Sequence, residues 1–380
     1  MSNPYDLAVV GSGILGLAHA WAGARLGKRV VVIERDSQAN GASIRNFGFV
    51  TVTGQARGEV WRRARRSRDL WAVAAPAAGI TVQQRGLVLP YRREEASAVV
   101  AAFLATEMGE ACEHLSAATL KRRFPMLRPA AVRGALYSPH ELRVESTLAI
   151  PALRAWLEAV HGVVFMSSTA VLAVEPPRIL TSRGTVEAEA AVVCPGDDLV
   201  SLFPDRIAAY GVTRCRLSML RLGDPGVRLP SPVMSDLGLI RYLGYGALPE
   251  AAPLAQRLAK EQADCLRNGI HLIVAQSADG SLVVGDSHHY AATPDPFAPG
   301  DVEGLILTEF EAATGLAPPP VLARWTGTYA SAEAAMFVDA PAPNVRLAMV
   351  TSGTGASTSF AIAEEVIGEL FNTPLGDTGL

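Results

Sequence analysis

The stretch YDLAVVGSGILGLAHAWAGARLGKRVVVIE, at residues 5–34, decides the fold. An aliphatic run at 5–10 precedes the glycine turn GSGILG, an alanine-rich helical segment extends to Leu26, and a second apolar run ends in Glu34. Strand, glycine turn, helix and strand in this order make up one βαβ unit of about 30 residues. The sequence therefore predicts two parallel strands joined by a helix.

The glycine turn has the spacing of a dinucleotide-binding site. Gly11 permits the tight turn, Gly13 lets the backbone approach a pyrophosphate, and Gly16 allows the helix to pack closely. The helix N-terminus offers N–H groups to the anion, and an acid at the end of the second strand can bind the ribose hydroxyls. The cofactor contacts predicted from this segment are Gly11, Ser12, Gly13, Ile14, Leu15, Gly16, Glu34 and Arg35.

Length and composition exclude several classes of protein. A chain of 380 residues, 49% apolar and 19% charged, is too long for one core and shows no compositional sign of disorder. Its 34 basic and 37 acidic residues give a net charge of −3, which argues against nucleic-acid binding. Nearly all the basic residues are arginines. We interpret most of them as coding bias on solvated faces, such as the helix around 57–68, and the rest as candidates for an anion pocket.

Cysteine usage and hydropathy indicate a reduced, cytoplasmic protein. Cys112, Cys194, Cys215 and Cys265 are scattered, without the density of a disulfide scaffold or any metal-ligand spacing, so we predict no metal site. The apolar stretch at 7–24 approaches the length of a membrane span, but glycines interrupt it. We interpret it as strand, turn and helix, and predict no membrane association.

The rest of the chain shows alternating helical and strand patterns without repeats or a low-complexity linker. The pair Asp279-Gly280 predicts a hairpin between two short apolar runs. Helices are predicted at 55–78, 92–109, 117–123, 148–160, 302–314 and 358–371. Strands are predicted at 81–90, 132–138, 163–174, 179–182, 186–193, 212–222, 238–243, 270–275, 281–284, 321–329 and 345–350.

A second glycine-rich loop, TSGTGAST at 351–358, leads into the last predicted helix. The N-terminus of such a helix can place positive potential against a flavin pyrimidine ring and stabilise the charge of the reduced flavin. A nicotinamide enzyme would usually complete its cofactor domain in the first half of the chain, so this loop favours FAD over NAD. A surface loop before a last helix is the alternative.

Five ordered motifs together resemble the D-amino-acid oxidase superfamily, which includes glycine oxidase and sarcosine oxidase. They are the dinucleotide fingerprint, made of the glycine turn GSGILG and Glu34, then GASIRNFG at 41–48, AVVCPG at 191–196, RWTGTY at 324–329 and the glycine loop at 351–358. More narrowly, 42–48 and 353–365 resemble the FAD-dependent oxidoreductase branch associated with phosphonate catabolism.

The resemblance implies an α/β (α+β) fold in which a Rossmann-like FAD-binding domain carries an inserted antiparallel β-sheet substrate domain. The implied FAD-binding domain is 1–80, 145–208 and 320–380, and the substrate-binding domain is 81–144 and 209–319. The implied FAD contacts are Ser43, Arg45, Asn46, Phe47 and Gly48 near phosphates and flavin, Val171 at the adenine, Pro195 and Gly196 at the pyrophosphate, and Gly353, Thr354, Gly355, Ser357 and Thr358 at the pyrimidine. Sarcosine oxidases hold their flavin through a cysteine. No cysteine lies in the matching C-terminal region here, so we predict non-covalent FAD.

Departures from the family pattern bear on the substrate. Glycine oxidases tend to carry an arginine after a Trp-Ala-Gly-Leu stretch, where this sequence has Tyr329, and their second arginine in the terminal loop is missing too. A plain α-amino acid is therefore less expected than a phosphonate, whose charge calls for other donors. The candidate substrate-binding residues are Arg45, His271, His288 and Tyr329, with His289 considered beside them. Structural roles for the histidines, and a cofactor-phosphate contact for Arg45, are the alternatives.

These observations predict an FAD-dependent enzyme that oxidises a small anionic amine such as (N-methyl) 2-aminoethylphosphonate. The imine would hydrolyse to an aldehyde, and O2 or another acceptor would take the electrons, O2 giving H2O2. No side chain is obligatory as a catalyst, because the amine lone pair assists hydride departure to the flavin. The alternatives are a glycine, sarcosine or D-amino acid oxidase-like enzyme, a non-catalytic flavin-binding subunit, and an NAD-dependent dehydrogenase.

Overall fold

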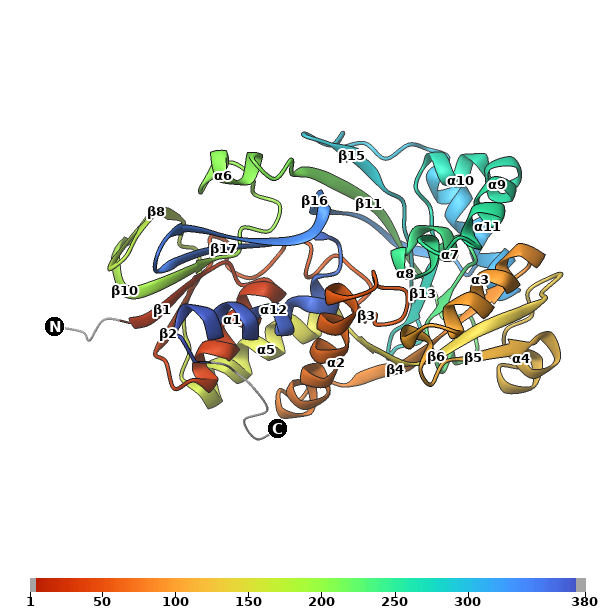
Figure 1. The fold of residues 1–380 in the computed structure, drawn as a ribbon, viewed down its shortest axis with the longest axis horizontal. Helices are drawn as coiled ribbons and strands as arrows, with labels where there is room; N and C mark the ends of the chain where they lie inside the picture. The colour runs from red at the N-terminus through yellow and green to blue at the C-terminus, as the bar shows by residue number, and fades with distance from the viewer. Residues whose placement is uncertain (1–4, 374–380) are drawn as a thin grey trace.

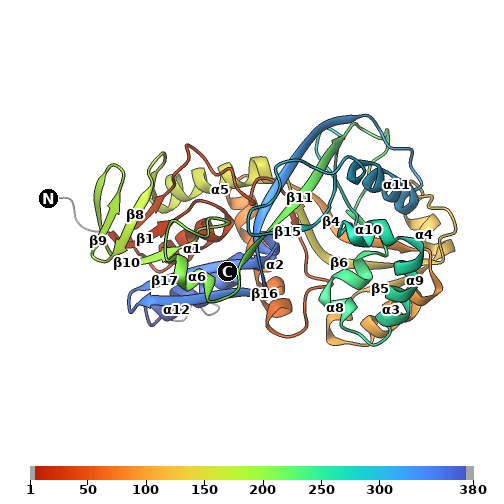
Figure 2. The same cartoon turned by 90° about the horizontal axis from the view of Figure 1, so that it is seen from above.

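A computed structural model describes residues 5–373, whose elements form two lobes that share one long strand (Figures 1 and 2). Residues 1–4 and 374–380, which belong to the predicted FAD-binding domain, lie outside the described residues. The first lobe, at the left of Figure 1, contains both the first strand and the last helix. The predicted α/β fold, with a Rossmann-like parallel region and an antiparallel region, is confirmed. The ranges of its two domains stay a prediction.

The first lobe is built on parallel strands in the spatial order β7 (Val164–Met166), β2 (Val30–Ile33), β1 (Tyr5–Val10), β10 (Gly184–Val193) and β17 (Val345–Ser352). The central strand β1 is buried on both faces, because Leu7 and Val9 face one apolar core while Ala8 faces another. A strand covered on both faces has no polar side, which explains the unbroken apolar run. An antiparallel ribbon, β8 (Val171–Glu175) and β9 (Arg178–Thr181), extends from the start of β10.

Four helices pack together against one face of this sheet (Figure 1): α1 (Ile14–Arg25), α2 (Glu59–Ala77), α5 (Ser146–His161) and α12 (Gly355–Leu370). Trp21 of α1 and Trp71 of α2 each pack edge-on against Phe360 of α12, with ring centroids 5.2 and 5.0 Å apart. Helix α1 begins so close to the strand turn that a Cβ at Gly16 would stand 1.9 Å from the carbonyl oxygen of Gly11. The third glycine of the fingerprint is therefore required by packing.

The second lobe is largely antiparallel, and its core includes Leu87, Val99, Phe103 and Val284. Its strands are β3 (Phe49–Val50), β4 (Val82–Tyr91), β5 (Glu113–Ser116), β6 (Gly134–Val144), β11 (Thr213–Leu222), β12 (Val233–Met234), β13 (Ile273–Gln276), β14 (Leu282–Gly285) and β15 (His289–Ala291). Its helices are α3 (Glu94–Leu104), α4 (Ala117–Arg123), α7 (Gly238–Arg241), α8 (Leu243–Gly246), α9 (Ala251–Glu261), α10 (Ala263–Arg267) and α11 (Val302–Thr314). A 3₁₀ turn at Glu107–Gly109 and the short helix α6 (Pro204–Ala208) complete the described elements.

Strand β16 (Val321–Ala342) belongs to both lobes (Figure 2). Its first half pairs antiparallel with β11, from Val321 to Ser331, and its second half pairs antiparallel with β17 of the first lobe. Tyr329 lies close to the change of partner, with Cys215 opposite it on β11. One backbone ladder thus connects the cofactor side of the molecule with the other lobe.

Several predicted elements differ from the structure. The segment 238–243 was predicted as a strand and is wrong, because it forms α7 and the start of α8, with Leu239 buried in the core and Tyr242 donating its N–H to Gly238. The segment 163–174 splits into β7 and β8, and the strand predicted at 321–329 continues to Ala342. Helices α9 and α10 were missed, although Ala251, Leu254 and Leu258 have the spacing of one buried helical face.

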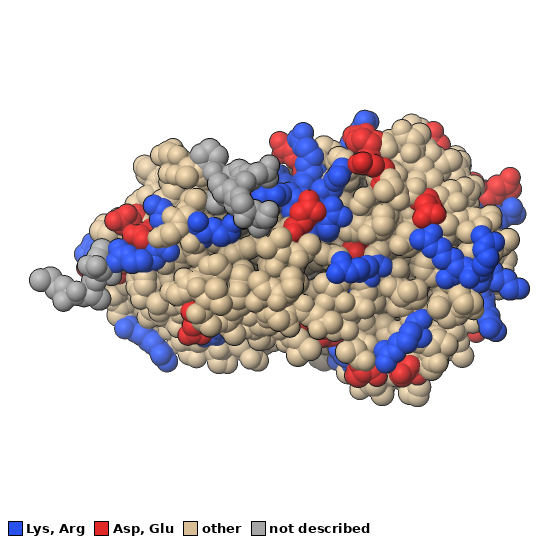
Figure 3. Space-filling view, turned by 90° about the horizontal axis from the view of Figure 1, so that it is seen from below, with Lys and Arg blue, Asp and Glu red and all other residues tan. Residues whose placement is uncertain are grey.

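Charged side chains of both signs are interspersed on the face shown in Figure 3. Several arginines of the α2 region form ion pairs with acids from elsewhere in the chain, as Arg65 does with Glu110 at 3.0 Å and Arg63 with Glu365 at 2.8 Å. Their solvated face is therefore also a network that joins segments distant in the sequence. Within residues 5–373, no helix combines the length and the apolar character needed to cross a membrane.

The buried Arg143 joins three segments of the chain, and its replacement tests how much these contacts stabilise the fold. Arg143 is fully buried and donates to the Phe47 carbonyl at 3.2 Å, to Glu145 at 2.9 Å and to Ser277 at 3.2 Å. Arg143→Met should lower the free energy of unfolding by about 3 kcal/mol, because the largely buried Glu145 carboxylate loses the closer of its two cations and keeps only Arg221, at 3.4 Å. Urea unfolding measures this change. The exposed Arg267→Met is the control and should leave the midpoint unchanged; equal losses in both variants would contradict the assignment.

Candidate active site

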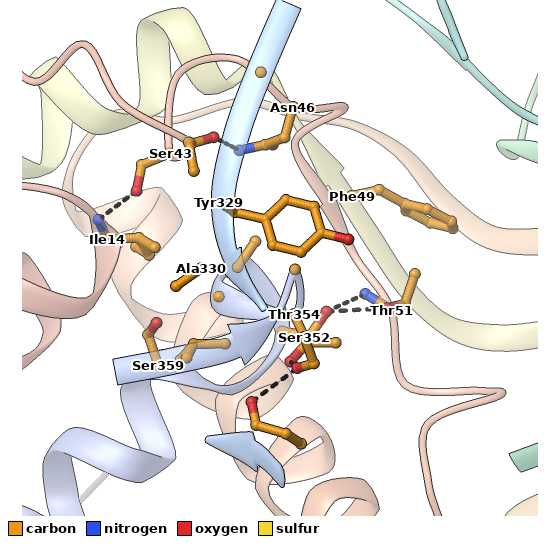
Figure 4. A pocket seen from close by; sticks show the side chains of 18 of the residues that line it. Ile14, Ser43, Asn46, Phe49, Thr51, Tyr329, Ala330, Ser352, Thr354 and Ser359 are labelled. Atoms are coloured by element: carbon orange, nitrogen blue, oxygen red, sulfur yellow. Dashed lines mark hydrogen bonds between the residues drawn. The ribbon is translucent and has the colours of Figure 1, made fainter. Parts of the chain in front are cut away.

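A cavity of about 460 Å³ extends from the glycine turn after β1 to the second lobe (Figure 4). The predicted cofactor residues that line it are Gly13, Ile14, Leu15, Gly16, Ser43, Arg45, Asn46, Phe47, Gly196, Gly353, Thr354, Gly355 and Ser357. All four candidate substrate residues, Arg45, His271, His288 and Tyr329, also line it. Among the described residues, Gly11, Ser12, Glu34, Arg35, Gly48, Val171, Pro195 and Thr358 are not part of its lining.

The start of α1 is open to an anion. Gly13 caps the helix without a side chain, and the first turn contains no acidic residue. The hydroxyl of Ser43 accepts a hydrogen bond from the Ile14 N–H at 2.9 Å, as Figure 4 shows, and lies 3.0 Å from where a Cβ on Gly13 would be. The other N–H groups of this turn are available to phosphate oxygens.

Glu34 closes the turn from outside the cavity. One oxygen of its carboxylate accepts hydrogen bonds from the backbone N–H and the hydroxyl of Ser12, both at 2.8 Å, and the other accepts from the Asp36 N–H at 3.0 Å. Arg35 forms an ion pair with Asp198 at 2.8 Å. The acid of the fingerprint thus fixes the glycine turn, and its contact with a ribose stays a prediction.

The C-terminal glycine loop forms another wall of the cavity. Gly353 has a φ of +71°, and a Cβ there would stand 3.1 Å from the Tyr329 ring. Helix α12 follows at Gly355, with no acid in its first turn, and its Ser357 hydroxyl accepts the Thr51 N–H at 2.8 Å. In Figure 4, the Tyr329 ring projects into the space between Asn46 and Thr354. The positive end of α12 is therefore directed at the cavity, as the flavin hypothesis requires.

The far end of the cavity, in the second lobe, brings together ionisable side chains from separate segments. His271 Nδ1 lies 3.2 Å from Asp286 Oδ1, and His271 Nε2 lies 3.3 Å from the Tyr242 hydroxyl. His288 Nδ1 donates to the Gly269 carbonyl at 2.9 Å. The His288 ring lies 5.0 Å from that of His271, so the two imidazoles and the carboxyl form one group.

Burial controls the charges of this group. It raises the pKa of Asp286 to about 8, partly opposed by the positive charge of Arg241. It lowers the pKa of His271 and of His288 well below the usual value, helped by their positive neighbours. Both imidazoles are therefore neutral at physiological pH, and the carboxyl ionises several pH units later than an ordinary aspartate.

Arg241 supplies positive charge beside this group. Its Nη2 donates to the Tyr290 hydroxyl at 2.9 Å, and among the described residues no carboxylate forms an ion pair with it. The Arg45 guanidinium also lines the cavity, and within residues 5–373 its one hydrogen bond is a long 3.5 Å contact to the Thr326 carbonyl. The cavity thus presents two guanidinium groups able to bind an anionic ligand.

Sequence reasoning missed part of this site. Arg241 and Tyr242 were assigned to a strand, and Asp286 lay beside the chosen histidines without being selected. The sequence could have indicated Asp286, because this acid stands between the apolar run at 281–284 and the two histidines at 288 and 289. His289, considered with His288, is outside the cavity lining and bonds Asn268 Oδ1 at 3.1 Å.

The cavity fits FAD. The part that a dinucleotide would occupy is lined by the start of α1, where Gly13 offers no side chain, and by the buried hydroxyl of Ser359, which has no hydrogen-bond partner among the described residues. Fold and cavity together define a flavoprotein oxidoreductase. The chain belongs to the DAO family, whose model is described as FAD dependent oxidoreductase and matches residues 6–368. FAD is therefore its cofactor, and the predicted family, cofactor and oxidoreductase class are confirmed.

Individual relatives agree with this assignment. A glycine oxidase of Geobacillus kaustophilus is 26% identical over 210 residues, which cover 52% of this chain and 55% of that protein. The match thus spans about half the length of that relative. The crystal structure of glycine oxidase from Geobacillus kaustophilus superposes with a TM-score of 0.76 at 18% identity, covering 98% of this chain and 96% of the other. L-proline dehydrogenase from P. horikoshii superposes with a TM-score of 0.75 at 17% identity, covering 98% and 94%. These structures share the fold.

The open start of α1 gives a direct test of cofactor placement. Gly13→Asp should abolish FAD binding, because a carboxylate would lie against both Ser43 and the pyrophosphate. The measurement is the FAD that acid precipitation releases into the supernatant, relative to protein. Gly300→Asp, at an exposed glycine with open space around it, is the matched control and should retain full FAD. Unchanged FAD content in Gly13→Asp would contradict the placement.

Proposed function

We propose that the protein catalyses the FAD-dependent oxidation of a small anionic primary or secondary amine. FAD, when bound, supplies the acceptor for the hydride lost from the carbon next to nitrogen. The resulting imine takes up water and yields an aldehyde and ammonia or methylamine. With O2 as the acceptor, one molecule of O2 is reduced to H2O2 for each amine oxidised; another electron acceptor is the alternative.

The environment of Arg241 carries this proposal. The guanidinium lines the cavity, donates to the Tyr290 hydroxyl and has no ion-pair partner among the described residues. A guanidinium that has unused hydrogen-bond donors and no carboxylate partner is suited to hold an anionic substrate in a fixed orientation. Tyr329 lies between the end of the cavity that holds Arg241 and the glycine loop at 353. This position supports a substrate that extends from the anion site toward the flavin.

We favour an aminoalkylphosphonate, such as 2-aminoethylphosphonate or its N-methyl derivative. A phosphonate offers three oxygens and up to two negative charges, which suits donors from more than one side chain, here Arg241, Arg45 and Tyr290. The absence of the glycine-oxidase-type arginine at Tyr329 supports the same choice. The 26% identical glycine oxidase supports an amino-acid substrate as the second candidate.

We also propose that FAD is bound non-covalently. Of the four cysteines, all within the described residues, only Cys194 lines the cavity, at the end of β10. Burial raises the pKa of its thiol, so the thiolate needed for a covalent bond is disfavoured. Release of the wild-type flavin by acid, in the FAD assay above, supports this proposal, and flavin that stays with the precipitated protein contradicts it.

A panel of amines tests the proposed reaction without assuming an electron acceptor. Under anaerobic conditions, loss of visible flavin absorption reports substrate oxidation directly. We expect rapid loss with 2-aminoethylphosphonate or N-methyl-2-aminoethylphosphonate, and slower loss with glycine, sarcosine and propylamine, which has no anionic group. A clear preference for glycine or sarcosine would replace the phosphonate by an amino acid. No loss with any amine would contradict amine oxidation.

Substitutions of Arg241 and Arg45 test the proposed anion site. Arg241→Met should lower kcat/KM for the phosphonate by about 10- to 100-fold, because one or two charge-assisted hydrogen bonds are lost, and should lower the value for propylamine much less. Arg45→Met is the comparison: a selective loss with the phosphonate would place Arg45 at the substrate. Equal losses with both amines would assign Arg45 to the cofactor. Arg241→Met with no selective loss would contradict the anion site.

A further inference from the structure

Removing hydride from an amine requires a free nitrogen lone pair. Alkylamines have pKa values of about 10, close to that of lysine, so the proposed substrate reaches the enzyme as an ammonium ion near neutral pH. Some group must take one proton before the carbon can lose hydride. The following inference rests on the proposed amine oxidation and identifies that group.

Three side chains at the second-lobe end of the cavity stand in a row. The Tyr242 hydroxyl is 3.3 Å from His271 Nε2, and His271 Nδ1 is 3.2 Å from Asp286 Oδ1. Tyr242 follows α7, His271 precedes β13 and Asp286 follows β14, so three segments converge. All three residues line the cavity. If the Tyr242 hydroxyl donates to Nε2, the imidazole carries its proton on Nδ1, facing the carboxyl.

Two atoms of this row have no hydrogen-bond partner among the described residues. They are His271 Nδ1 and Asp286 Oδ1, which face each other without the alignment of a full hydrogen bond. The residues are each only 4% exposed. An unsatisfied buried polar group destabilises the folded state, and such groups are uncommon in folded proteins unless they have a role. An arrangement kept purely for stability would have satisfied them.

We propose that Tyr242, His271 and Asp286 form a proton relay that removes a proton from the substrate ammonium. The N–H bond of the ammonium breaks as its proton passes to the Tyr242 oxygen. The phenolic proton moves to His271 Nε2, and the proton on Nδ1 moves to the Asp286 carboxylate. One N–H bond is lost, one O–H bond forms at Asp286, and no electrons are transferred. The amine is left neutral, with its lone pair free.

The surroundings suit this direction of transfer. Groups that face the row are Arg241 from α7, His288 after β14, Tyr290 of β15, Tyr329 of β16 and Cys215 of β11. Arg241 is the cation of this set, and its positive charge opposes the protonation of His271. Burial makes Asp286 a stronger base than an ordinary aspartate, with a pKa raised to about 8. The carboxylate therefore accepts the proton, and the imidazole passes it on.

The same geometry could be taken for a metal site, because His271, Asp286 and His288 lie within ligand distance of one another. One observation favours the relay. The Arg241 guanidinium lies close enough to disfavour a second cation. A bound metal is therefore treated as an outcome that would overturn the proposal.

The pH dependence of anaerobic flavin reduction tests the relay. In the wild type, the rate with a saturating aminoalkylphosphonate should rise with pH around an apparent pKa of about 8, because the relay accepts a proton only once Asp286 is ionised. Asp286→Asn should reduce the rate at pH 8 by about 100-fold. The rate of this variant should recover toward wild type near pH 10, where the substrate is itself deprotonated.

His271→Gln should behave like Asp286→Asn, since it breaks the row in the middle. Asp264→Asn, at an exposed position on α10, is the matched control and should keep the wild-type profile. If Asp286→Asn keeps the wild-type profile while amines still reduce the flavin, the relay is wrong and amine oxidation stands. If no amine reduces the wild-type flavin at any pH, both proposals fail.

A second measurement needs no turnover. In protein labelled with ¹⁵N in its histidine rings, the His271 signals, assigned with His271→Gln, should shift with a midpoint near pH 8 as Asp286 ionises. This shift should vanish in Asp286→Asn and persist in Asp264→Asn. Its absence from the wild type would overturn the relay, and so would one equivalent of a divalent metal in the purified protein that Asp286→Asn loses.

Discussion

The active site depends on the hydrogen-bond ladder of β16, which pairs with β11 in one half and with β17 in the other. β17 continues into the C-terminal glycine loop and α12, so this ladder fixes the flavin end of the cavity relative to the second lobe. Because backbone hydrogen bonds in a strand are obligatory and directional, the relative position of the two lobes is set by register. Tyr329 lies where the strand changes partner, between the glycine loop and His288.

The low polarity of the buried site gives the few charged groups a large effect. Arg241 near the cavity end lowers the pKa of His288 and opposes the burial that raises the pKa of Asp286. The same cation is proposed to hold the substrate anion, so anion binding and the basicity of Asp286 are electrostatically linked.

Elements were predicted correctly where local sequence determines them and wrongly where distant residues do. Strands, turn and helix at 5–34 were predicted correctly, because their signals are local glycine spacing and apolar runs. The segment at 238–243 was misassigned, because its apolar residues serve a short helix whose buried side is created by distant elements. Strand β16 continued past its predicted end because β17 supplies a second partner, which no local pattern reveals.

The sequence by itself determined the dinucleotide turn and the C-terminal glycine-rich loop, and with them the family and cofactor, because these depend on residues adjacent in the chain. It also supplied His271, His288, Arg45 and Tyr329 as candidates, but not the relation among them. The tertiary structure alone decided that Asp286 faces His271, that Tyr242 stands on its other side and that Arg241 lies nearby. Folding brings these separate segments together and removes water from them, and that loss of solvation sets their charge states.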